Sequence, residues 1–546
     1  MQNMEQHSTI WHNSLTRRVC LWLLAGLRGS KLAGFWPFMA RQYQASRLRG
    51  VWEHALGRPL SATERAGAFG LTGRLWAVLR RWTAALRPED SLLARLIRAI
   101  RGSGLLRHSV TGRFLLRLRP GDVLLGAFCL FLPLDWGLRT YAPAAVGTLW
   151  CHAFLVLCIL IAVLRTLNPN RAFHSDATPL DGPMLLFIGI GVLLVGVVSP
   201  SLSVAVEGWR AVYEYMFWFY VIVRLARGRR AVWLCYTLFV LMGVLVGLHG
   251  VYQYIVGTPI PAGWVSVYET GVRTRAFSIV GSPNILGCLM VMLAPMAAGL
   301  AYTMRGNGRK LLCWAGVGVM CLCCVFTFSR GAWVGLAVAV VLFALLRDRR
   351  LLLLAALAAL AGLLTPQIAN RISFLFTADF ARNNSTAGRG ARWEYGLGLL
   401  GRSDALFGFG LGRFGGAVAM RNQTLENVTY FYLDNYYMKT FVEMGWLGLG
   451  GYLLLLAATL WNGLRALFRV RKHNESYSLA CGLFSGMAGV LVHCYFENIF
   501  EVPYMNAYFW GLAALLFVIG WRMNAGHGGE EKSGQLSIAG ESTPQT

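Results

Sequence analysis

The sequence is poor in charged residues, and acidic residues are the scarcest. Only 14% of its 546 residues are charged, with 25 Asp and Glu against 51 Lys and Arg, whereas 56% are hydrophobic. Several uninterrupted apolar runs approach or exceed the roughly 18 residues that cross a bilayer as a helix. The composition therefore predicts a polytopic membrane protein.

Alternation of apolar and polar residues is missing from these runs. A transmembrane β-barrel shows segments of about 10 residues in which every second side chain faces lipid. The runs at residues 184–198, 231–251 and 351–364 do not alternate in this way. Their pattern excludes a barrel and predicts an all-α bundle of transmembrane helices.

Cysteine is missing from residues 365–433, so no disulfide framework is expected there. The one dense cysteine group, Cys321-Leu322-Cys323-Cys324, lies inside an apolar run. Free cysteine in such a place packs as a small apolar residue. We therefore predict no metal site.

The formal charge of +26 would suggest nucleic acid binding in a soluble protein, but its placement argues against this. Residues 1–119 hold 20 of the 51 Lys and Arg, and others cluster in short loops at 227–230, 305–310, 347–350 and 465–472. This is the positive-inside pattern of membrane proteins. Residues 1–119 are interpreted as a basic cytoplasmic extension, either amphipathic helices on the membrane surface or a partly disordered segment.

About twelve spans are predicted, nine within residues 120–364 and three within 434–522. We place them at residues 122–138, 144–166, 183–200, 208–226, 231–255, 285–303, 311–328, 333–346, 351–364, 434–461, 478–496 and 505–522. Both termini are then cytoplasmic, with a disordered tail at 523–546. Residues 365–433 form one large extracytoplasmic loop containing short helices, far longer than an ordinary connection.

Arginine on the outer side needs an explanation. Arg330 falls in a short hairpin between two apolar helices, on the side that topology should leave poor in basic residues. An anionic ligand at the membrane surface is one partner for it. The alternative is a side chain that extends to lipid headgroups.

Four more arginines are expected on this side: Arg275, Arg389, Arg392 and Arg413. Converging guanidinium groups suit a diphosphate, since each can bind its oxygens with two donors. The glycine-rich run at 408–416 can bring backbone amides to a phosphate, or can simply be a flexible connection.

A reacting hydroxyl would need a base, and Asp434 is the candidate at the outer start of a span. Its alternative role is to cap that helix. Asn435 can orient a sugar hydroxyl or join the cap, and Glu443 is expected to make a structural hydrogen bond.

At these residues the chain resembles the O-antigen ligase and polymerase superfamily of bacterial envelope enzymes. The likeness covers residues 120–522 and rests on the order of short motifs: Arg275-Ala276-Phe277-Ser278, Gly281-Ser282-Pro283-Asn284, Ser329-Arg330-Gly331-Ala332, Arg392-Trp393, Gly408-Phe409-Gly410-Leu411-Gly412, Asp434-Asn435-Tyr436-Tyr437 and Glu443-Met444-Gly445-Trp446-Leu447-Gly448. The resemblance implies transfer of a glycan from undecaprenyl diphosphate to an acceptor glycan or lipid, outside the bacterial cytoplasmic membrane. It implies no metal, nucleotide sugar or other cofactor, and it implies that Arg330 and Arg392 grip the diphosphate, with Arg275 contributing.

One residue departs from the family pattern. Ligases of this type usually carry His where this chain has Asp434, and polymerase-like members look closer to the Asp-Asn form. The departure favours a polysaccharide polymerase. Because a free aspartate is a weak base, His493, Glu497 and His249 are reserve candidates, each with a structural alternative.

Three classes of function fit a bundle of this size. The leading hypothesis is a glycosyltransferase, either a polymerase or a ligase that attaches the glycan to a lipid or protein anchor. A transporter or flippase fits the span number, but internal repeats and charges in the middle of spans are not evident. A non-catalytic scaffold would leave Arg330 and Asp434 without a role.

Overall fold

The computed structural model describes residues 120–167, 178–261, 264, 274–378, 388–423, 433–472 and 474–523. The chain divides into two compact units, residues 98–163 with 178–546, and residues 1–97 with 164–177. The features below lie in the first unit. The predicted basic extension at 1–119 and nearly all of the predicted tail at 523–546 lie outside the described residues.

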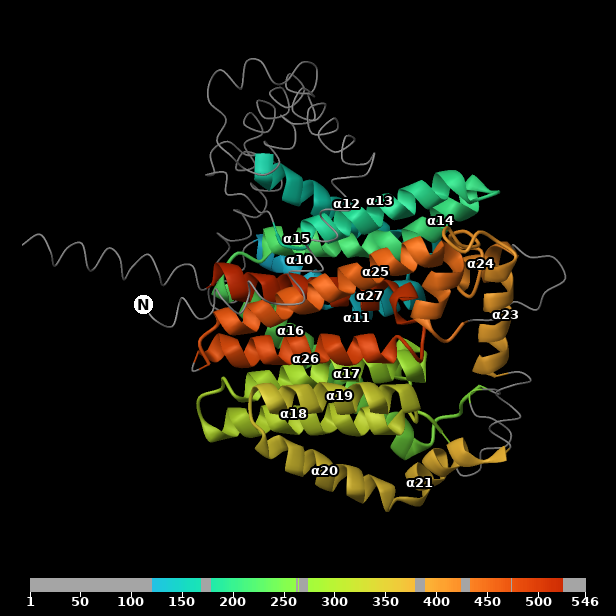
Figure 1. Cartoon of the computed structure of the whole chain (residues 1–546). Helices are drawn as coiled ribbons and strands as arrows, with labels where there is room; N and C mark the ends of the chain where they lie inside the picture. The colour runs from blue at the N-terminus through green and yellow to red at the C-terminus, as the bar shows by residue number, and fades with distance from the viewer. Residues whose placement is uncertain are drawn as a thin grey trace, which may run out of the picture. The chain divides into compact units, whose positions relative to one another are not determined.

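The regular elements of the described chain are helices (Figure 1). In chain order they are α10 (Pro120–Cys129), α11 (Phe131–Tyr141), α12 (Ala144–Leu167), α13 (Asp181–Val197), α14 (Leu202–Tyr213), η2 (Glu214–Phe217), α15 (Trp218–Leu225), α16 (Arg229–Val256), η3 (Ser278–Val280), α17 (Pro283–Ala301), α18 (Asn307–Phe326), α19 (Arg330–Leu346), α20 (Arg350–Leu363), α21 (Pro366–Ser373), η4 (Phe374–Phe376), α23 (Arg389–Gly401), α24 (Ala417–Asn422), α25 (Tyr436–Arg469), α26 (Glu475–His493), η5 (Ile499–Glu501), α27 (Pro503–Phe517) and the π-helical turn η6 (Val518–Arg522).

The all-α prediction is confirmed, whereas the predicted number of twelve spans is not confirmed. Seven helices in the described residues are long and apolar enough to cross a membrane, or up to nine if two bent pairs each form one span. The bent pairs are α10 with α11 and α20 with α21. The three remaining predicted spans correspond to two shorter apolar helices, α13 and α19, and to α14 and α15, which the turn η2 interrupts.

Helices α17, α26 and α27 form the centre of the bundle. Nearly all of their side chains are buried, and α17 packs against α16, α18, α19 and α26. Small residues allow these helices to approach closely, as is common where lipid-facing helices associate. A Cβ atom built on Gly489 of α26 would lie 2.7 Å from the carbonyl oxygen of Gly335 in α19.

The long helix α25 is broken at Gly445, which has φ +62°. Backbone groups of the preceding loop, at residues 405–410, form hydrogen bonds with the helix backbone on both sides of the break. The amide groups of Phe409 and Gly410 donate to the carbonyls of Val442 and Glu443, at 2.8 and 2.9 Å, and residues 446 and 447 donate back to residues 405 and 406 at 3.0 Å each. The glycine-rich run is therefore a partner of the transmembrane helix.

Short helices gather at one end of the bundle, drawn at the right in Figure 1. Helices α23 and α24 lie there, and α21 turns 87° away from α20 to reach the same end. The start of α25 is joined to the end of α26 by a hydrogen bond from the Tyr436 amide to the Cys494 carbonyl, at 2.9 Å. We call this the site end of the bundle.

Candidate active site

Asp434 lies between two arginines of α23. The Nη1 atom of Arg392 is 3.1 Å from Oδ2 of Asp434, and Nε of Arg389 is 3.4 Å from the same oxygen. The two arginines are three residues apart, which places them on one face of the helix. All three side chains remain partly exposed, Asp434 at 21%, Arg392 at 28% and Arg389 at 40%, so this group is open to a ligand from outside the bundle.

Arg389 also reaches a second segment of the site end. Its Nη2 atom donates to the carbonyl oxygen of Phe496, at 2.8 Å. One guanidinium therefore joins Asp434 to the turn between α26 and α27. The same turn carries Glu497.

Arg330 is the first residue of α19, directly after a tight corner. Phe328 has φ +50°, a left-handed conformation that is uncommon for a residue with a side chain. Arg371 of α21 fixes this corner, since its Nε and Nη2 atoms donate to the Phe328 carbonyl at 3.2 and 3.0 Å. Arg330 itself is half-buried, with its guanidinium carbon 6.0 Å from the ring centre of Phe374.

Arg275 holds the same corner from the other side. Its Nε atom donates to the Thr327 carbonyl at 2.8 Å, Nη1 to the Trp264 carbonyl at 2.7 Å, and Nη2 to Oδ1 of Asn284 at 3.1 Å. The side chain is buried, and burial lowers the pKa of Arg275 to about 10. Three of its donors thus bind the protein itself, which makes it a positioning residue.

The arginines at this end repel one another. The positive charges of Arg330 and Arg389 both act to lower the pKa of Arg275, while the carboxylate of Glu497 opposes them. Arg389 also lies close enough to Arg330 and Arg371 for a like-charge interaction with each. Five arginines, Arg275, Arg330, Arg371, Arg389 and Arg392, therefore share one neighbourhood with two carboxylates, Asp434 and Glu497. We call these seven residues the arginine cluster.

Glu497 is the buried carboxylate of the cluster. It is 6% exposed, and it accepts hydrogen bonds from the Asn284 side chain and from the Asn498 amide. The pKa of Glu497 is raised to about 7, first by burial and then by the negative charge of Asp434. Its environment thus differs from that of Asp434, which is partly exposed and ion-paired.

Two predicted residues, Asn435 and Glu443, take structural positions. The side chain of Asn435 caps α25 by accepting from the Met438 amide at 3.0 Å, so the cap falls on Asn435 and not on Asp434. Glu443 is buried and accepts from Nζ of Lys439 at 2.7 Å and from the Phe414 amide at 3.1 Å. Lys439 also pairs with Glu501 at 3.1 Å, which links α25 to the turn before α27.

Arg413 lies on its own loop. Its Nη1 atom donates to the Phe409 carbonyl at 2.8 Å, and its guanidinium carbon is 4.0 Å from the centre of the Phe409 ring. Partial burial lowers the pKa of Arg413. The amides of the glycine-rich run at residues 409, 410 and 414 donate to α25, which leaves those three unavailable for a phosphate.

His493, at the end of α26, is 1% exposed. Neither ring nitrogen has a hydrogen-bond partner within the described chain. The ring packs beside α19, where a Cβ atom built on Gly331 would lie 3.0 Å from its Cδ2 atom. The other reserve histidine, His249, bonds to the Ser278 hydroxyl at 3.0 Å.

The structure adds three residues that the site prediction missed: Arg371, Asn284 and Lys439. Pro366 at the start of α21 and the strong amphipathicity of that helix were signals for a short helix, but not for the contact that Arg371 makes. Asn284 follows a proline that begins α17, so its sequence context indicated only a helix start. Among the described residues, no group of three or more His, Cys, Asp or Glu side chains could hold a metal ion.

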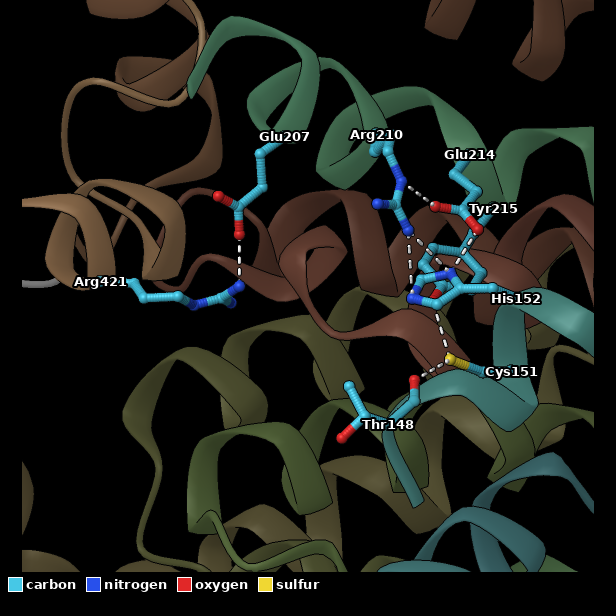
Figure 2. Close-up of polar contacts among 8 residues, drawn as sticks. All are labelled: Thr148, Cys151, His152, Glu207, Arg210, Glu214, Tyr215 and Arg421. Carbon is cyan, nitrogen blue, oxygen red and sulfur yellow. Dashed lines mark hydrogen bonds and ion pairs between the residues drawn. The ribbon is translucent and has the colours of Figure 1, made fainter. Parts of the chain in front are cut away.

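A second polar cluster lies between α12 and α14 (Figure 2). The Nδ1 atom of His152 is 2.5 Å from Oε1 of Glu214, and Nε of Arg210 is 3.2 Å from Oε2 of Glu214. Glu207, on the same side of α14, pairs with Arg421 of α24. On the neighbouring α11, Arg139 pairs with Asp135 at 2.9 Å. We call the residues of these contacts the balanced cluster.

Comparison with known families gives one match. Residues 315–453 match the model of the family described as O-antigen ligase. The matched segment runs from α18 into α25 and contains four arginines of the arginine cluster together with Asp434. No curated protein matches the chain. The family match confirms the resemblance to the O-antigen ligase superfamily.

Proposed function

We propose that this chain is a membrane-embedded glycosyltransferase that moves a glycan from undecaprenyl diphosphate to an acceptor hydroxyl. The observation that carries the proposal is the excess of arginine among the described residues of the site end, where five guanidinium groups lie with two carboxylates. Gathering like charges is unfavourable unless a ligand of opposite charge offsets it. A diphosphate joined to a lipid tail has both the charge and the membrane location that this position requires.

The cluster divides into residues that bind the donor and residues that position them. Arg330, Arg389 and Arg392 are partly exposed and would bind the diphosphate oxygens. Arg275 and Arg371 are buried and hold the carbonyls of residues 327 and 328, which sets the direction of Arg330. Asn435 and Glu443 support the start of α25 from within, and Arg413 supports the loop beside it.

The reaction needs no covalent intermediate on the protein. The acceptor hydroxyl oxygen attacks the anomeric carbon, the bond from that carbon to the diphosphate breaks, and its electron pair leaves with undecaprenyl diphosphate. The hydroxyl proton passes to a carboxylate of the site. Arginines aimed at the leaving diphosphate stabilise the charge that develops on it, which is electrostatic and positional catalysis.

The orientation in the membrane follows from the basic residues at the opposite end. Arg229, Arg305, Arg347 and Arg350 lie at helix ends remote from α23, as do the basic residues after α25. Under the positive-inside rule that end is cytoplasmic. The arginine cluster then faces the outer side of the bacterial cytoplasmic membrane, where lipid-linked glycans are used.

The acceptor decides between two activities. Asp434 in place of histidine favours a polymerase, for which the acceptor is the end of a growing polysaccharide. The match to a family described as O-antigen ligase favours attachment to a lipid or protein anchor. A transporter or flippase is disfavoured because the arginine cluster lies at one end of the bundle and not at its middle.

The test is reconstitution of the full chain in vesicles with an undecaprenyl-diphosphate oligosaccharide and candidate acceptors. Release of undecaprenyl diphosphate together with a lengthened or anchored glycan supports the proposal, and the glycan product identifies polymerase or ligase. Movement of intact donor across the bilayer without bond cleavage would establish a transporter instead.

A further inference from the structure

The arginine cluster contains two carboxylates in opposite environments. Asp434 is partly exposed and receives two guanidinium groups on a single oxygen, Oδ2. Glu497 is buried, and its hydrogen bonds come from the neutral Asn284 side chain and the Asn498 amide. Pairs of acids whose surroundings differ in this way commonly divide acid–base roles between them.

The two acids lie on either side of one guanidinium. Arg389 donates from Nε to Asp434 and from Nη2 to the Phe496 carbonyl, directly before Glu497. The hydrogen bond between the Tyr436 amide and the Cys494 carbonyl joins the same two segments. The acids are close enough for the charge of Asp434 to act on Glu497. A hydroxyl that reaches one carboxylate is therefore close to the other.

Resting on the transfer reaction proposed above, we infer that Glu497, and not Asp434, accepts the proton of the attacking acceptor hydroxyl. Asp434 then serves as the fixed anion that aligns Arg389 and Arg392 for the diphosphate. During the step, the bond from oxygen to the anomeric carbon forms while the O–H bond breaks, and the proton moves to the carboxylate of Glu497. The proton is later released to water, which returns the enzyme to its starting state.

The chemistry of the two sites supports this assignment. Proton transfer is most efficient when the acceptor titrates near the working pH. The pKa of Glu497, about 7, meets this condition. Asp434 instead has both of its guanidinium contacts on one oxygen, Oδ2, which suits it to align Arg389 and Arg392. His493 is a poorer acceptor, because a proton there would add a buried positive charge next to Arg389.

Every charged or titratable group around Glu497 enters the expected pH dependence. Arg275 comes from the loop before α17, Arg389 from α23 and Asp434 from the start of α25. Among the described residues, Asn284 and Cys288 of α17 and Cys494 after α26 also interact with Glu497. Arginines keep their charge throughout the accessible pH range, so Glu497 is the group expected to titrate near neutrality.

The test is single-turnover transfer by the full chain in vesicles between pH 5.5 and 9, for the wild type, Glu497→Gln, Glu497→Asp and Asp434→Asn. Because the ionised form is active, the wild-type rate should rise tenfold per pH unit below about pH 7 and level off above it. Glu497→Gln keeps an oxygen for Asn284 but cannot take a proton. It should lose about 100-fold or more in rate and lose the pH dependence.

We call the rise of the transfer rate with pH the rising limb. Glu497→Asp should retain this limb with its midpoint at a different pH. Asp434→Asn should retain the limb near pH 7, at a reduced rate. A purely structural role for Glu497 would lower the rate without removing the limb. Binding of undecaprenyl diphosphate to Glu497→Gln should stay within about threefold of wild type, which shows a folded site. The matched control is Glu475→Gln at the opposite end of α26, where the rate and the limb should be unchanged.

Three results would overturn the inference. A Glu497→Gln protein with the wild-type rate and limb removes Glu497 from the step. Loss of the limb in Asp434→Asn or in His493→Gln, with the limb intact in Glu497→Gln, moves the role to that residue. If the wild type releases no undecaprenyl diphosphate with any acceptor, the transfer reaction itself fails and the inference fails with it.

Discussion

The two charged clusters of this protein differ in their balance of charge. In the balanced cluster, Arg139, Arg210 and Arg421 each face a carboxylate, namely Asp135, Glu214 and Glu207. In the arginine cluster, five arginines lie with two carboxylates among the described residues. Ion pairs at the edge of a bundle need nothing further, whereas a surplus of one sign is stable only with a ligand or at a cost to folding. The two clusters therefore differ in the ratio of positive to negative side chains, and both contain charged residues.

The arginines of the two clusters also donate hydrogen bonds to different kinds of acceptor. Arg139 and Arg210 donate to carboxylates on their own or adjacent helices. Arg275 and Arg371 instead donate to backbone carbonyls of one corner, directly before Arg330. The described residues of the arginine cluster therefore carry a surplus of positive charge, whereas the charges of the balanced cluster are paired.

The largest effect is expected from removing the donor-binding arginines. Arg330→Ala or Arg392→Ala should lower the rate of glycan transfer by about 100- to 1,000-fold, since each removes a charged donor to the leaving group. The transfer rate is measured as the release of undecaprenyl diphosphate in vesicles that contain the protein. Arg210→Ala in the balanced cluster is the matched control and should stay near wild type. Equal losses in both clusters would contradict the distinction.

The next largest effect is expected in the thermal stability of the protein when undecaprenyl diphosphate is bound. Undecaprenyl diphosphate should raise the thermal unfolding temperature of the wild type, because a ligand that binds only the folded state stabilises it by mass action. Arg210→Ala should show the same rise, and Arg330→Ala should show much less. Unfolding can be followed by intrinsic tryptophan fluorescence in detergent. A rise of the same size with undecaprenyl monophosphate would indicate that the lipid tail, and not the diphosphate, is recognised.

Asp434→Asn should have a smaller effect on transfer. Without the carboxylate, Arg389 and Arg392 lose their common partner, and misplacement of the donor should lower the rate by about 10- to 100-fold. Steady-state rates at several donor concentrations would show whether donor affinity falls together with turnover. Wild-type kinetics in this variant would mean that the arginines hold their positions without Asp434.

Arg275→Gln should act mainly on stability. The variant leaves at least one buried acceptor among the Thr327, Trp264 and Asn284 oxygens without its donor, at a cost of about 1–3 kcal/mol for each group left unsatisfied. The rate should fall less than in Arg330→Ala, with Arg330 still present but less firmly held. Denaturation in mixed micelles measures the first effect, and transfer assays measure the second. A stable but inactive variant would show that Arg275 binds the donor directly.

The smallest effect is expected in the balanced cluster. Glu214→Gln removes the carboxylate shared by His152 and Arg210 but leaves both groups partly exposed (Figure 2). Ion pairs at such positions contribute less than about 1 kcal/mol. Unfolding and transfer should both stay close to wild type. A large loss of transfer would reveal a functional role for a region that the charge balance marks as structural.

Residue types and their order were enough to predict several local features. A helix cap was expected at Asp434, with Asn435 able to join it, and the structure places the cap on Asn435. Glu443 was expected to make a structural hydrogen bond, and the structure shows that contact. Arg330 was identified because a basic residue was unexpected in a short outer corner, whereas Arg389 and Arg392 were identified as further positive charge inside the long loop. Each of these inferences depends on neighbouring residues in sequence, which the amino-acid order records directly.

Other features could not be predicted, because they depend on segments far apart in the chain. The glycine-rich run had two sequence interpretations, and neither anticipated that it completes the broken helix α25 through backbone hydrogen bonds. Arg371 was overlooked because its partner, the Phe328 carbonyl, is 43 residues away. Backbone acceptors carry no residue identity, so no pattern of residue types could have marked this pairing.

Hydropathy and the placement of basic residues determined by themselves that this chain is a helical membrane protein with an arginine-bearing end, because transfer into lipid depends on composition and run length. Only the tertiary structure decided which arginines are partly exposed, which ones bind the backbone, and which carboxylate is buried. Burial and like-charge repulsion act through space, and folding alone brings Arg275, Arg389, Asp434 and Glu497 to the same end of the bundle.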